Sequence, residues 1–259
     1  MSLRVTVLGS GSRGNVTLVE GPRGRIIIDM GLSEREASRR LRTIGVEPRT
    51  VDALLVSHEH GDHVDGAPLF SRRNGVPIYT TFATAAAARL TLGAVAALVT
   101  IEAGRAFEAA GMRIHPFSVP HDAADNVGYV IEENRSRVGY ATDLGYPSAV
   151  ASERLRGCGL LVIEANHDLE MLRSGPYPAH VKQRVMGRGG HLSNEQAAQL
   201  LSETVTRDTR TVFLAHLSER NNDGRLALEA GRGALRVLGR DSVHLELTYS
   251  SRPGRPAEV

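Results

Sequence analysis

The chain is poor in cysteine and lysine. The first scarcity bears on disulfide bonds and the cellular compartment, and the second on which residues can bind anions. Cys158 is the only cysteine among 259 residues, so no internal disulfide can form, which favours a reducing compartment such as the cytoplasm. Lys182 is the only lysine, so arginine carries nearly all of the positive charge. Arginine binds phosphate well in a bidentate manner, but a compositional bias of the genome explains the excess at least as well.

Long apolar runs and a strong net charge are absent too. No stretch of about eighteen apolar residues occurs, which excludes a membrane-spanning helix. Residues 3–8 predict a strand at once, with no signal-peptide pattern before them. The formal net charge is +2, too small to indicate nucleic-acid binding by itself. No repeat is present, which excludes a solenoid. We therefore expect a cytoplasmic protein without membrane attachment.

The densest group of chemically active side chains follows a short apolar run at residues 53–56. His58, His60, Asp62 and His63 come just after it. If the strand extends through His60, both His58 and His60 point to one side, because side chains alternate along a strand. Neutral imidazole and carboxylate groups suit zinc, manganese or iron. The segment predicts a metal site, against the alternative of a chance polar loop, and further ligands must follow downstream.

Apolar patterning predicts strands interleaved with helices. Strands are expected at residues 3–8, 16–20, 25–29, 53–56, 77–80, 127–132, 137–142, 160–164, 211–215 and 243–247, with two or three antiparallel strands between 95 and 118. Helices are expected at residues 34–44, 64–73, 83–92, 177–186, 194–203 and 226–238. Residues 251–259 contain proline and glycine without periodicity, so we expect a disordered tail after one domain of residues 1–250.

Polar residues recur at the C-terminal ends of the predicted strands. They are Asp29, His58, His121, Asp143, Glu164 and His216. Sites in sheets flanked by helices gather at such strand ends, on loops held by a rigid scaffold. Any one of these residues could be structural, but a structural role for all of them together is much less reasonable.

This grouping predicts two divalent cations, manganese or zinc, in one centre. The first cation would take His58, His60 and His121. The second would take Asp62, His63 and His216, and Asp143 would bridge both, with a shared water or hydroxide between them. Asp62 would also orient or deprotonate that water. His191 precedes a helix N-terminus, where anions bind well, and would touch the transferred phosphoryl group or protonate the leaving oxygen.

Supporting and substrate-binding roles are assigned to further residues. Ser33 and Glu36 already cap the next helix. Asp29 is therefore expected to orient a ligand histidine by a hydrogen bond to the ring nitrogen that does not bind the metal. We expect the same of Glu164 and His167, while His167 and its neighbour Asn166 could also line the substrate pocket. Tentative substrate-binding residues are Ser10, Ser12, Asn15, Ser193, Asn194 and Arg188, joined by Arg184. The alternatives are an ordinary hairpin loop at residues 9–15 and solvated helix-face arginines.

The cluster SHEHGDH, with Asp29 before it and His121, Asp143 and His216 after it, resembles the metallo-β-lactamase superfamily over essentially the whole chain. The resemblance implies an α/β fold, a four-layer αβ/βα sandwich of two mixed β-sheets flanked by helices, with the metals at one edge. Members hydrolyse β-lactams, thioesters, phosphodiesters and nucleic acids, so the fold leaves the reaction open.

Side motifs resemble one branch of that superfamily, YycJ (WalJ), whose members are described as bacterial 5′-to-3′ DNA exonucleases. The motifs are GSGSRGN at 9–15, PHDAADNVGY at 120–129, TDLGY at 142–146, EANHD at 164–168, GPYP at 175–178, GHLSN at 190–194 and AHLSERNN at 215–222. The resemblance implies a metal-dependent hydrolase of DNA phosphodiesters, with manganese favoured for activity. It also places His191 like the active-site histidine of RNase Z relatives. The alternatives are a small-molecule (cyclic) phosphodiesterase, an RNA-processing nuclease and a non-catalytic binding module.

Overall fold

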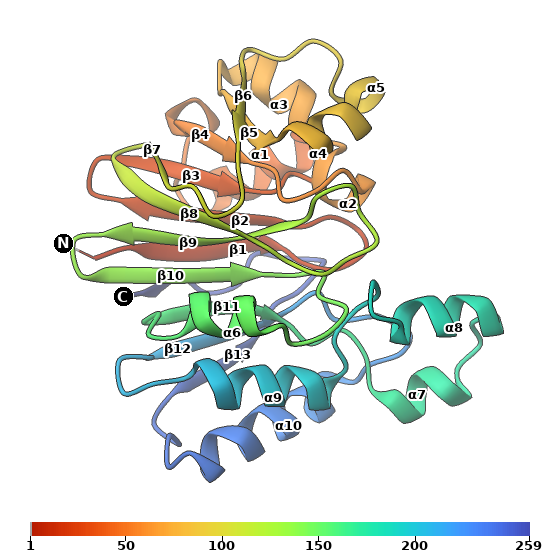
Figure 1. The fold of residues 1–259 in the computed structure, drawn as a ribbon. Coiled ribbons are helices and arrows are strands. Elements are labelled where there is room, and N and C mark those ends of the chain that lie inside the picture. The colour runs from red at the N-terminus through yellow and green to blue at the C-terminus, as the bar shows by residue number, and fades with distance from the viewer. Residues whose placement is uncertain (1) are drawn as a thin grey trace.

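Two seven-stranded sheets form the body of the computed structural model, which describes residues 2–259 (Figure 1). The first sheet has the order β14 (Ala257–Glu258), β1 (Arg4–Gly9), β2 (Val16–Gly21), β3 (Gly24–Ile28), β4 (Ala53–Leu55), β5 (Ile78–Thr81) and β6 (Leu98–Ile101). The second has the order β13 (His244–Leu247), β12 (Thr211–Ala215), β11 (Leu160–Glu164), β10 (Ser136–Ala141), β9 (Val127–Glu133), β8 (Met112–Ser118) and β7 (Phe107–Ala109). In each sheet antiparallel pairs on one side give way to parallel pairs on the other.

Helices cover the outer face of each sheet, which confirms the predicted four-layer sandwich (Figure 1). The helices that lie in the chain between strands of the first sheet are α1 (Glu34–Thr43), η1 (Pro48–Thr50), α2 (Gly61–Val64), α3 (Ala67–Asn74), α4 (Phe82–Ala87) and α5 (Arg89–Leu92). The second sheet is covered by α6 (Ala149–Leu155), α9 (Asn194–Thr204) and α10 (Gly224–Val237). Two further helices, α7 (Leu169–Ser174) and α8 (Ala179–Met186), project from one edge. No helix described in residues 2–259 is long and apolar enough to cross a membrane.

Alternation along the central strands builds separate cores on the two faces of each sheet. In β3, Ile26 and Ile28 pack between the sheets, whereas Ile27 packs among the residues that face α1 and α3. In β11, Val162 packs between the sheets and Ile163 packs toward the helices. Strands that are buried on both faces read as continuous apolar runs, which is why the sequence predicts them well.

Several predicted elements differ from the structure. The expected helix at residues 64–73 is two helices, α2 and α3, broken at Gly66, whose added Cβ would lie 1.9 Å from Leu32 O. The segment 95–118 does not form one antiparallel group, because β6 joins the first sheet parallel to β5 while β7 and β8 join the second. The short helices α6 and α7 were not predicted. Local patterning cannot specify the partner of a strand, and helices this short carry little periodic signal.

The C-terminal segment corrects the prediction of a disordered tail over residues 251–259. Strand β14 pairs with β1, and Leu3 and Val259 exchange backbone hydrogen bonds of 2.9 Å. Val259 O also accepts a hydrogen bond from Ser136 Oγ at 2.6 Å. These partners are distant in the chain, so the sequence of the tail alone gives no sign of them.

Backbone hydrogen bonds join the loops that follow β1, β3 and β4 at one edge of the first sheet. Asn15 N donates to Asp62 O at 2.8 Å, and Gly31 N donates to Asn15 O at 3.0 Å. Met30 N donates to His63 O at 2.8 Å. The approach is so close that a Cβ on Gly31 would lie 1.7 Å from Asp62 O, so only glycine fits there.

We predict that Gly31→Ala destabilises the fold, because its methyl group meets backbone that cannot move aside. The expected loss is about 1–3 kcal/mol in the free energy of unfolding, measured by urea titration. The matched control is Gly233→Ala on α10, where an added Cβ meets nothing within 4 Å. That variant should gain up to about 1 kcal/mol, since alanine is the better helix former. Equal midpoints for the two variants would contradict this account of the loop packing.

Candidate metal centre

Three imidazole nitrogens converge at the ends of β4 and β8. Nε2 of His58 lies 3.1 Å from Nδ1 of His60, and Nε2 of His121 lies 3.2 Å from the same atom. Of the three side chains, those of His58 and His121 are almost fully buried. A neutral imidazole has one acceptor nitrogen, and three acceptors that face a common point suit a cation.

A second group gathers beside the first, around α2 and the end of β12. His216 Nε2 lies 3.2 Å from Asp62 Oδ2, and His63 Nε2 lies 3.6 Å from the same oxygen. Ligand atoms of Asp62, His63 and His216 all lie within 4.8 Å of one another. The two groups are those that the sequence predicts for two separate cations.

Asp143 lies between the two groups. One carboxylate oxygen, Oδ2, is 3.1 Å from His63 Nε2, and the other, Oδ1, is 3.8 Å from His121 Nε2. Oδ2 is buried and makes no well-aligned hydrogen bond within residues 2–259, even to the nearby His63 Nε2. A buried carboxylate oxygen without such a bond is costly unless something positive occupies the space beside it. This donor set therefore fits divalent cations.

The outward-facing nitrogens of four of the five candidate ligand histidines are already occupied. Four contacts fix them: His63 Nδ1 with Asp29 Oδ2 at 2.8 Å, His216 Nδ1 with Glu164 Oε1 at 3.0 Å, His121 Nδ1 with Gly190 O at 3.0 Å and His58 Nδ1 with Ser57 Oγ at 3.0 Å. A ring nitrogen that donates a proton outward leaves the opposite nitrogen as a free acceptor facing inward. Each of these four rings is thus oriented so that its opposite nitrogen, once it carries no proton, can face a cation.

Asp29 is the supporting residue on the side of the first sheet. Its fully buried carboxylate accepts hydrogen bonds from Ser57 N at 2.8 Å, from Ser57 Oγ at 3.0 Å and from the Tyr140 hydroxyl at 3.0 Å, besides contacting His63. The structure thus brings Asp29 to the position that the sequence predicts. Ser57 and Tyr140 were not predicted. Ser57 could have been found, since it adjoins His58, but Tyr140 reads as an ordinary core residue of β10.

Glu164 has the matching position on the side of the second sheet. Its carboxylate accepts hydrogen bonds from Leu144 N at 2.9 Å, Leu192 N at 3.0 Å and His191 Nδ1 at 2.8 Å, in addition to His216. Burial alone would raise the pKa of Glu164, but the charges of His191 and the hydrogen bonds from His191 and His216 lower that pKa to about 2. Glu164 is therefore an anion that fixes two histidines at once.

Charge alternates through the centre. Burial would raise the pKa of Asp62 and Asp143, but protonated His63 and His216 bring both carboxyl pKa values below their usual range. Conversely, burial lowers the pKa of His63 and His216, yet the surrounding carboxylates raise both above the usual histidine value. Burial is the main cause that lowers the pKa of His58 and of His121. Without a cation, the two groups thus differ in the protons they hold.

Left-handed backbone turns present three of these side chains. Asp29, Asp143 and His216 have φ angles of 59°, 59° and 56°, a region that residues other than glycine seldom adopt. Each follows directly after, or within two residues of, a buried parallel strand. Strain of this kind persists where the surroundings over-determine it, and functional sites are the usual place.

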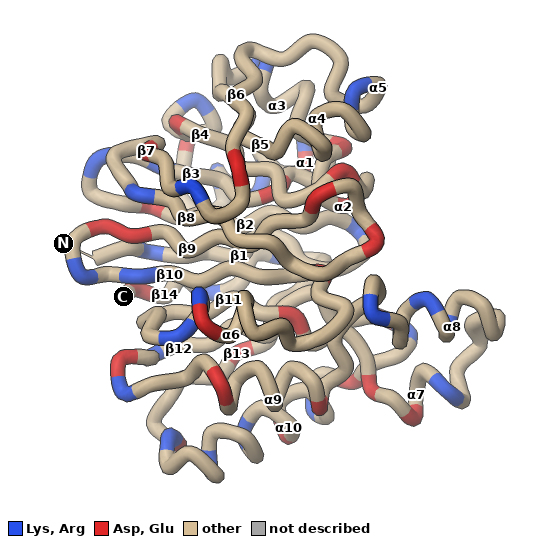
Figure 2. Tube along the Cα trace, in the orientation of Figure 1, with Lys and Arg blue, Asp and Glu red and all other residues tan. Residues whose placement is uncertain are grey.

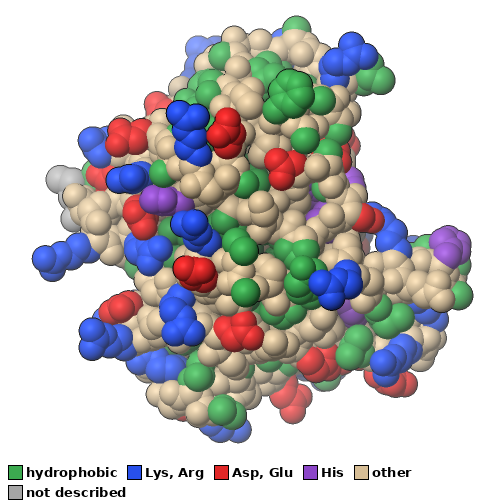
Figure 3. All heavy atoms as spheres, viewed as in Figure 1, with side chains coloured by type: hydrophobic (Ala, Val, Ile, Leu, Met, Phe, Trp, Pro, Cys, Tyr) green, Lys and Arg blue, Asp and Glu red, His purple; other side chains and the backbone are tan. Residues whose placement is uncertain are grey.

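His191 and four of the candidate ligands, His60, Asp62, Asp143 and His216, line a cavity of about 480 Å³. His191 stacks on His216 with ring centroids 5.3 Å apart, and its Nδ1 lies 3.5 Å from Asp143 Oδ1. Burial lowers the pKa of His191, but the charge and hydrogen bond of Glu164 raise it above its usual value. Histidine atoms reach the surface on the right of Figure 3, the side on which α7 and α8 project.

The structure gives most of the expected substrate-binding residues other partners. Ser12 lines the cavity, but Ser10 is buried and accepts the His216 backbone N–H at 2.7 Å. Ser193 caps α9, and Asn194 is bonded to Asn222 at 2.9 Å. Two further expected substrate-binding residues also contact other parts of the chain. Asn15 lies 3.0 Å from His63 Nε2, and the Arg188 guanidinium lies 4.4 Å from the centroid of the Tyr146 ring.

The neighbours Asn166 and His167 separate in space. Asn166 lines the cavity and donates a hydrogen bond to His216 O at 2.9 Å. His167 is buried, and within the described chain neither of its ring nitrogens has a hydrogen-bond partner. His167 was expected to support a ligand histidine, and in the structure its ring forms a hydrogen bond with none. Tyr177, Val181 and Asn221 line the cavity without having been predicted, although Tyr177 and Asn221 lie in motifs that the sequence shows.

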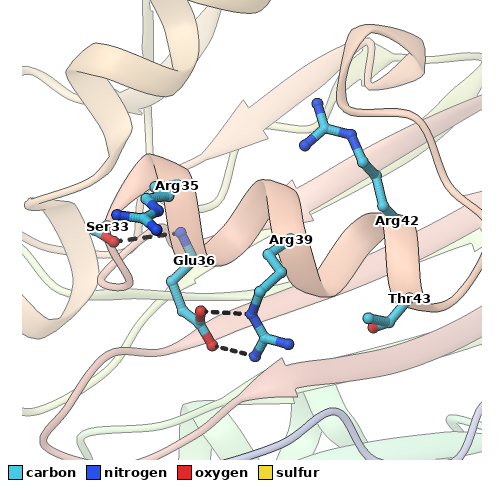
Figure 4. Close-up of a pocket in the computed structure, with 6 residues that line it drawn as sticks. All are labelled: Ser33, Arg35, Glu36, Arg39, Arg42 and Thr43. Carbon is cyan, nitrogen blue, oxygen red and sulfur yellow. Dashed lines mark hydrogen bonds and ion pairs between the residues drawn. The ribbon is translucent and has the colours of Figure 1, made fainter.

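A different hollow runs along α1 on the outside of the first sheet (Figure 4). It is lined by Arg35, Arg39, Arg42 and neighbouring polar residues, and Glu36 is paired with Arg39 at 2.8 Å. These are solvated side chains of one helix, and no candidate ligand is among them.

Comparison with known proteins places these observations in context. The model of the family described as "Beta-lactamase superfamily domain" matches residues 24–217. The chain is 33% identical over 229 residues to exodeoxyribonuclease YycJ of Bacillus anthracis, covering 88% of this chain and 87% of that protein. It is also 33% identical over 231 residues to exodeoxyribonuclease WalJ of Streptococcus pneumoniae, covering 88% and 86%. The metallo-β-lactamase fold protein YhfI of Bacillus subtilis superposes with a TM-score of 0.76 at 17% identity, covering 100% of both chains.

We predict that divalent-cation affinity rises with pH across the neutral range. His63 and His216 hold protons because their pKa values are raised, and a cation must displace those protons from Nε2. Each proton released gives up to about a tenfold gain in affinity per pH unit, until the pH exceeds the raised pKa. Calorimetric titration with Mn²⁺ in buffers of different ionisation enthalpy measures both the affinity and the proton release. Affinity that is constant with pH, with no proton released, would contradict this charge arrangement.

Proposed function

Since the chain belongs to the metallo-β-lactamase superfamily, we propose that it is a metal-dependent phosphodiester hydrolase, and specifically a DNA exonuclease that acts from the 5′ end. The observation that carries the proposal is the convergence of acceptor atoms around Asp143, whose Oδ2 is buried without a well-aligned hydrogen bond among the described residues. The names of the two relatives, which this chain matches over most of their lengths, support the choice of DNA as the substrate.

The residues fit two divalent cations, either manganese or zinc. His58, His60 and His121 would hold one, Asp62, His63 and His216 the other, and Asp143 would contact both. When bound, such cations make water a nucleophile at neutral pH and offset the charge of a phosphodiester. Histidine and carboxylate donors suit manganese and zinc alike.

Two residues of the chain would handle protons and the leaving group. Asp62 is an anion whose Oδ2 already contacts His216, and at the cavity wall it can accept a proton from the attacking water. His191 lines the same cavity, with Nδ1 anchored on Glu164, so its ring is held for protonating the leaving oxygen. Its raised pKa favours the protonated form that a general acid needs.

Phosphate groups next to the reacting one would meet basic residues of the projecting edge. Arg184 lines the cavity, and Figure 2 shows further basic positions along α8 and the segment after it. Arg184 is ion-paired with Asp122 at 2.5 Å, so its charge is partly offset. A reducing cytoplasm remains our proposal for the compartment, since the only cysteine, Cys158, is buried as a free thiol.

A second candidate function is hydrolysis of a small phosphodiester. A cavity of about 480 Å³ lies in the usual small-molecule range of roughly 300–1,000 Å³, and the net charge of +2 is low for a polymer-binding protein. The two functions differ in how the rate depends on substrate length. A nuclease gains affinity with added phosphates in a salt-dependent manner, whereas a small-ester hydrolase does not.

The proposed function predicts release of mononucleotides from the 5′ end of duplex DNA. The assay uses 5′-labelled and 3′-labelled DNA, matched RNA and a small chromogenic phosphodiester, with added Mn²⁺. Asp62→Ala should abolish activity, and Asp208→Ala, which removes an exposed carboxylate, should not. Turnover of the small ester alone would favour the second candidate, and release from the 3′ end would reverse the polarity.

We further predict that His191→Ala lowers kcat by about 10²- to 10⁴-fold, the usual contribution of a general acid. Metal content should stay unchanged, because His191 belongs to neither of the two proposed ligand sets. His244→Ala is the matched control, since that side chain is exposed on β13 and pairs only with Glu246. Steady-state kinetics and metal analysis of the three proteins provide the measurement. Loss of bound metal in His191→Ala would show that His191 is a ligand rather than an acid.

A further inference from the structure

Helices α7 and α8 form an arm (residues 169–186) that stands away from the sandwich beside the cavity (Figure 1). None of the eight residues of α8 is buried, although Val181, Val185 and Met186 are apolar. Met186 is 37% exposed. Val181 and Val185 are half-buried, so α8 gains only part of the usual stabilisation from packing and keeps apolar surface open to the cavity.

One side of the arm forms a wall of the cavity. Tyr177, Val181, Arg184 and Val185 all line it, opposite the candidate ligands. Val181 and Val185 are four residues apart and so share one face of α8, and Tyr177, which lies just before the N-cap Pro178, lines the same cavity. The wall thus joins an aromatic ring, two aliphatic side chains and one arginine.

The wall is tied to the site at its C-terminal end. Val185 O accepts the backbone N–H of His191 at 2.9 Å, and Arg184 Nε donates to Asp122 Oδ2 at 2.5 Å. Gly190 O, a few residues further, accepts the hydrogen bond from His121 Nδ1. A group that rests on this wall is therefore held at a fixed place relative to His121 and His191.

We propose that Tyr177, Val181 and Val185 form a subsite for the base of the terminal nucleotide, an inference that rests on the proposed nuclease function. Aromatic side chains stack on any nucleobase, because every base has a π-face. Arg184 lines the same cavity and would meet the phosphate of that nucleotide, although its charge is partly offset by Asp122. The subsite is continuous with the catalytic cavity, which favours a part of the substrate over a protein partner as its occupant.

We expect the terminal nucleotide to leave its base pair when its base rests on this wall. The cavity of about 480 Å³ lies within the range of small-molecule pockets, which suits one nucleotide. Enzymes that draw a base out of the stack must offset the lost stacking, and a ring such as that of Tyr177 replaces it. The enzyme should therefore act without strong sequence preference and should prefer single-stranded or frayed ends.

The test combines a variant with a modified substrate. Tyr177→Ala and Tyr177→Phe are compared with wild type on an oligonucleotide with a normal terminal base and on one whose terminal nucleotide is abasic. Losing one aromatic stack should raise KM roughly 5- to 150-fold, with kcat changed less. Wild type should show a higher KM for the abasic end than for the normal end. Tyr177→Ala should show nearly the same KM for both ends, and Tyr177→Phe should behave as wild type.

Controls separate the possible failures. Phe82→Ala removes an aromatic ring that is 76% exposed on α4, away from the cavity, and should match wild type. Equal KM values for wild type and Tyr177→Ala on the normal end would overturn the subsite while leaving the nuclease function intact. An effect found only when the second nucleotide is abasic would overturn the assignment to the terminal base. Failure of wild type to cleave any oligonucleotide with Mn²⁺ would instead overturn the proposed function itself.

Discussion

Two buried carboxylates, Asp29 from the end of β3 and Glu164 from the end of β11, orient the two histidines of the second ligand group. One carboxylate belongs to each sheet; Asp29 contacts the outer nitrogen of His63, and Glu164 contacts that of His216. Burying a charge is costly unless it is well hydrogen-bonded, and each carboxylate accepts bonds from several donors of the chain. If either were lost, a ring could turn a proton inward and repel a cation. The rest of the site depends on this orientation.

The fold supplies the positions that these contacts need. Parallel strands of both sheets end at one edge, so residues far apart in the chain arrive at a common place. Left-handed turns at Asp29, Asp143 and His216 then direct the side chains inward instead of continuing the strands. Backbone bonds between the loops around Asn15, Gly31 and Asp62 keep that edge rigid. A rigid frame is what holds reactive groups at productive distances.

The sequence predicts which metal-competent residues the structure brings together far better than it predicts the lining of the cavity. Metal-competent residues such as His58 and His216 follow buried apolar strands, and both features can be read locally. Small polar residues such as Ser10 and Ser193 carry no comparable signal, because their side chains can equally satisfy nearby backbone groups, and in the structure they do. The sheet to which β6 belongs and the pairing of β14 depend on partners distant in the chain. The cavity wall of the arm cannot be predicted locally either, since the sequence predicts Tyr177 and Val181 only as parts of one ordinary helix, and the structure begins that helix at Ala179.

We propose that the oriented histidines and Asp143 together hold two cations in one centre. Anomalous X-ray diffraction from crystals grown with Mn²⁺ tests it most directly, because the method counts and places the metals at once. If two cations bind, we expect two anomalous peaks per chain, with Asp143 contacting both. One peak should lie among His58, His60 and His121, and the other among Asp62, His63 and His216. A single peak at saturating Mn²⁺, or an Asp143 carboxylate turned away from one of two peaks, would contradict it.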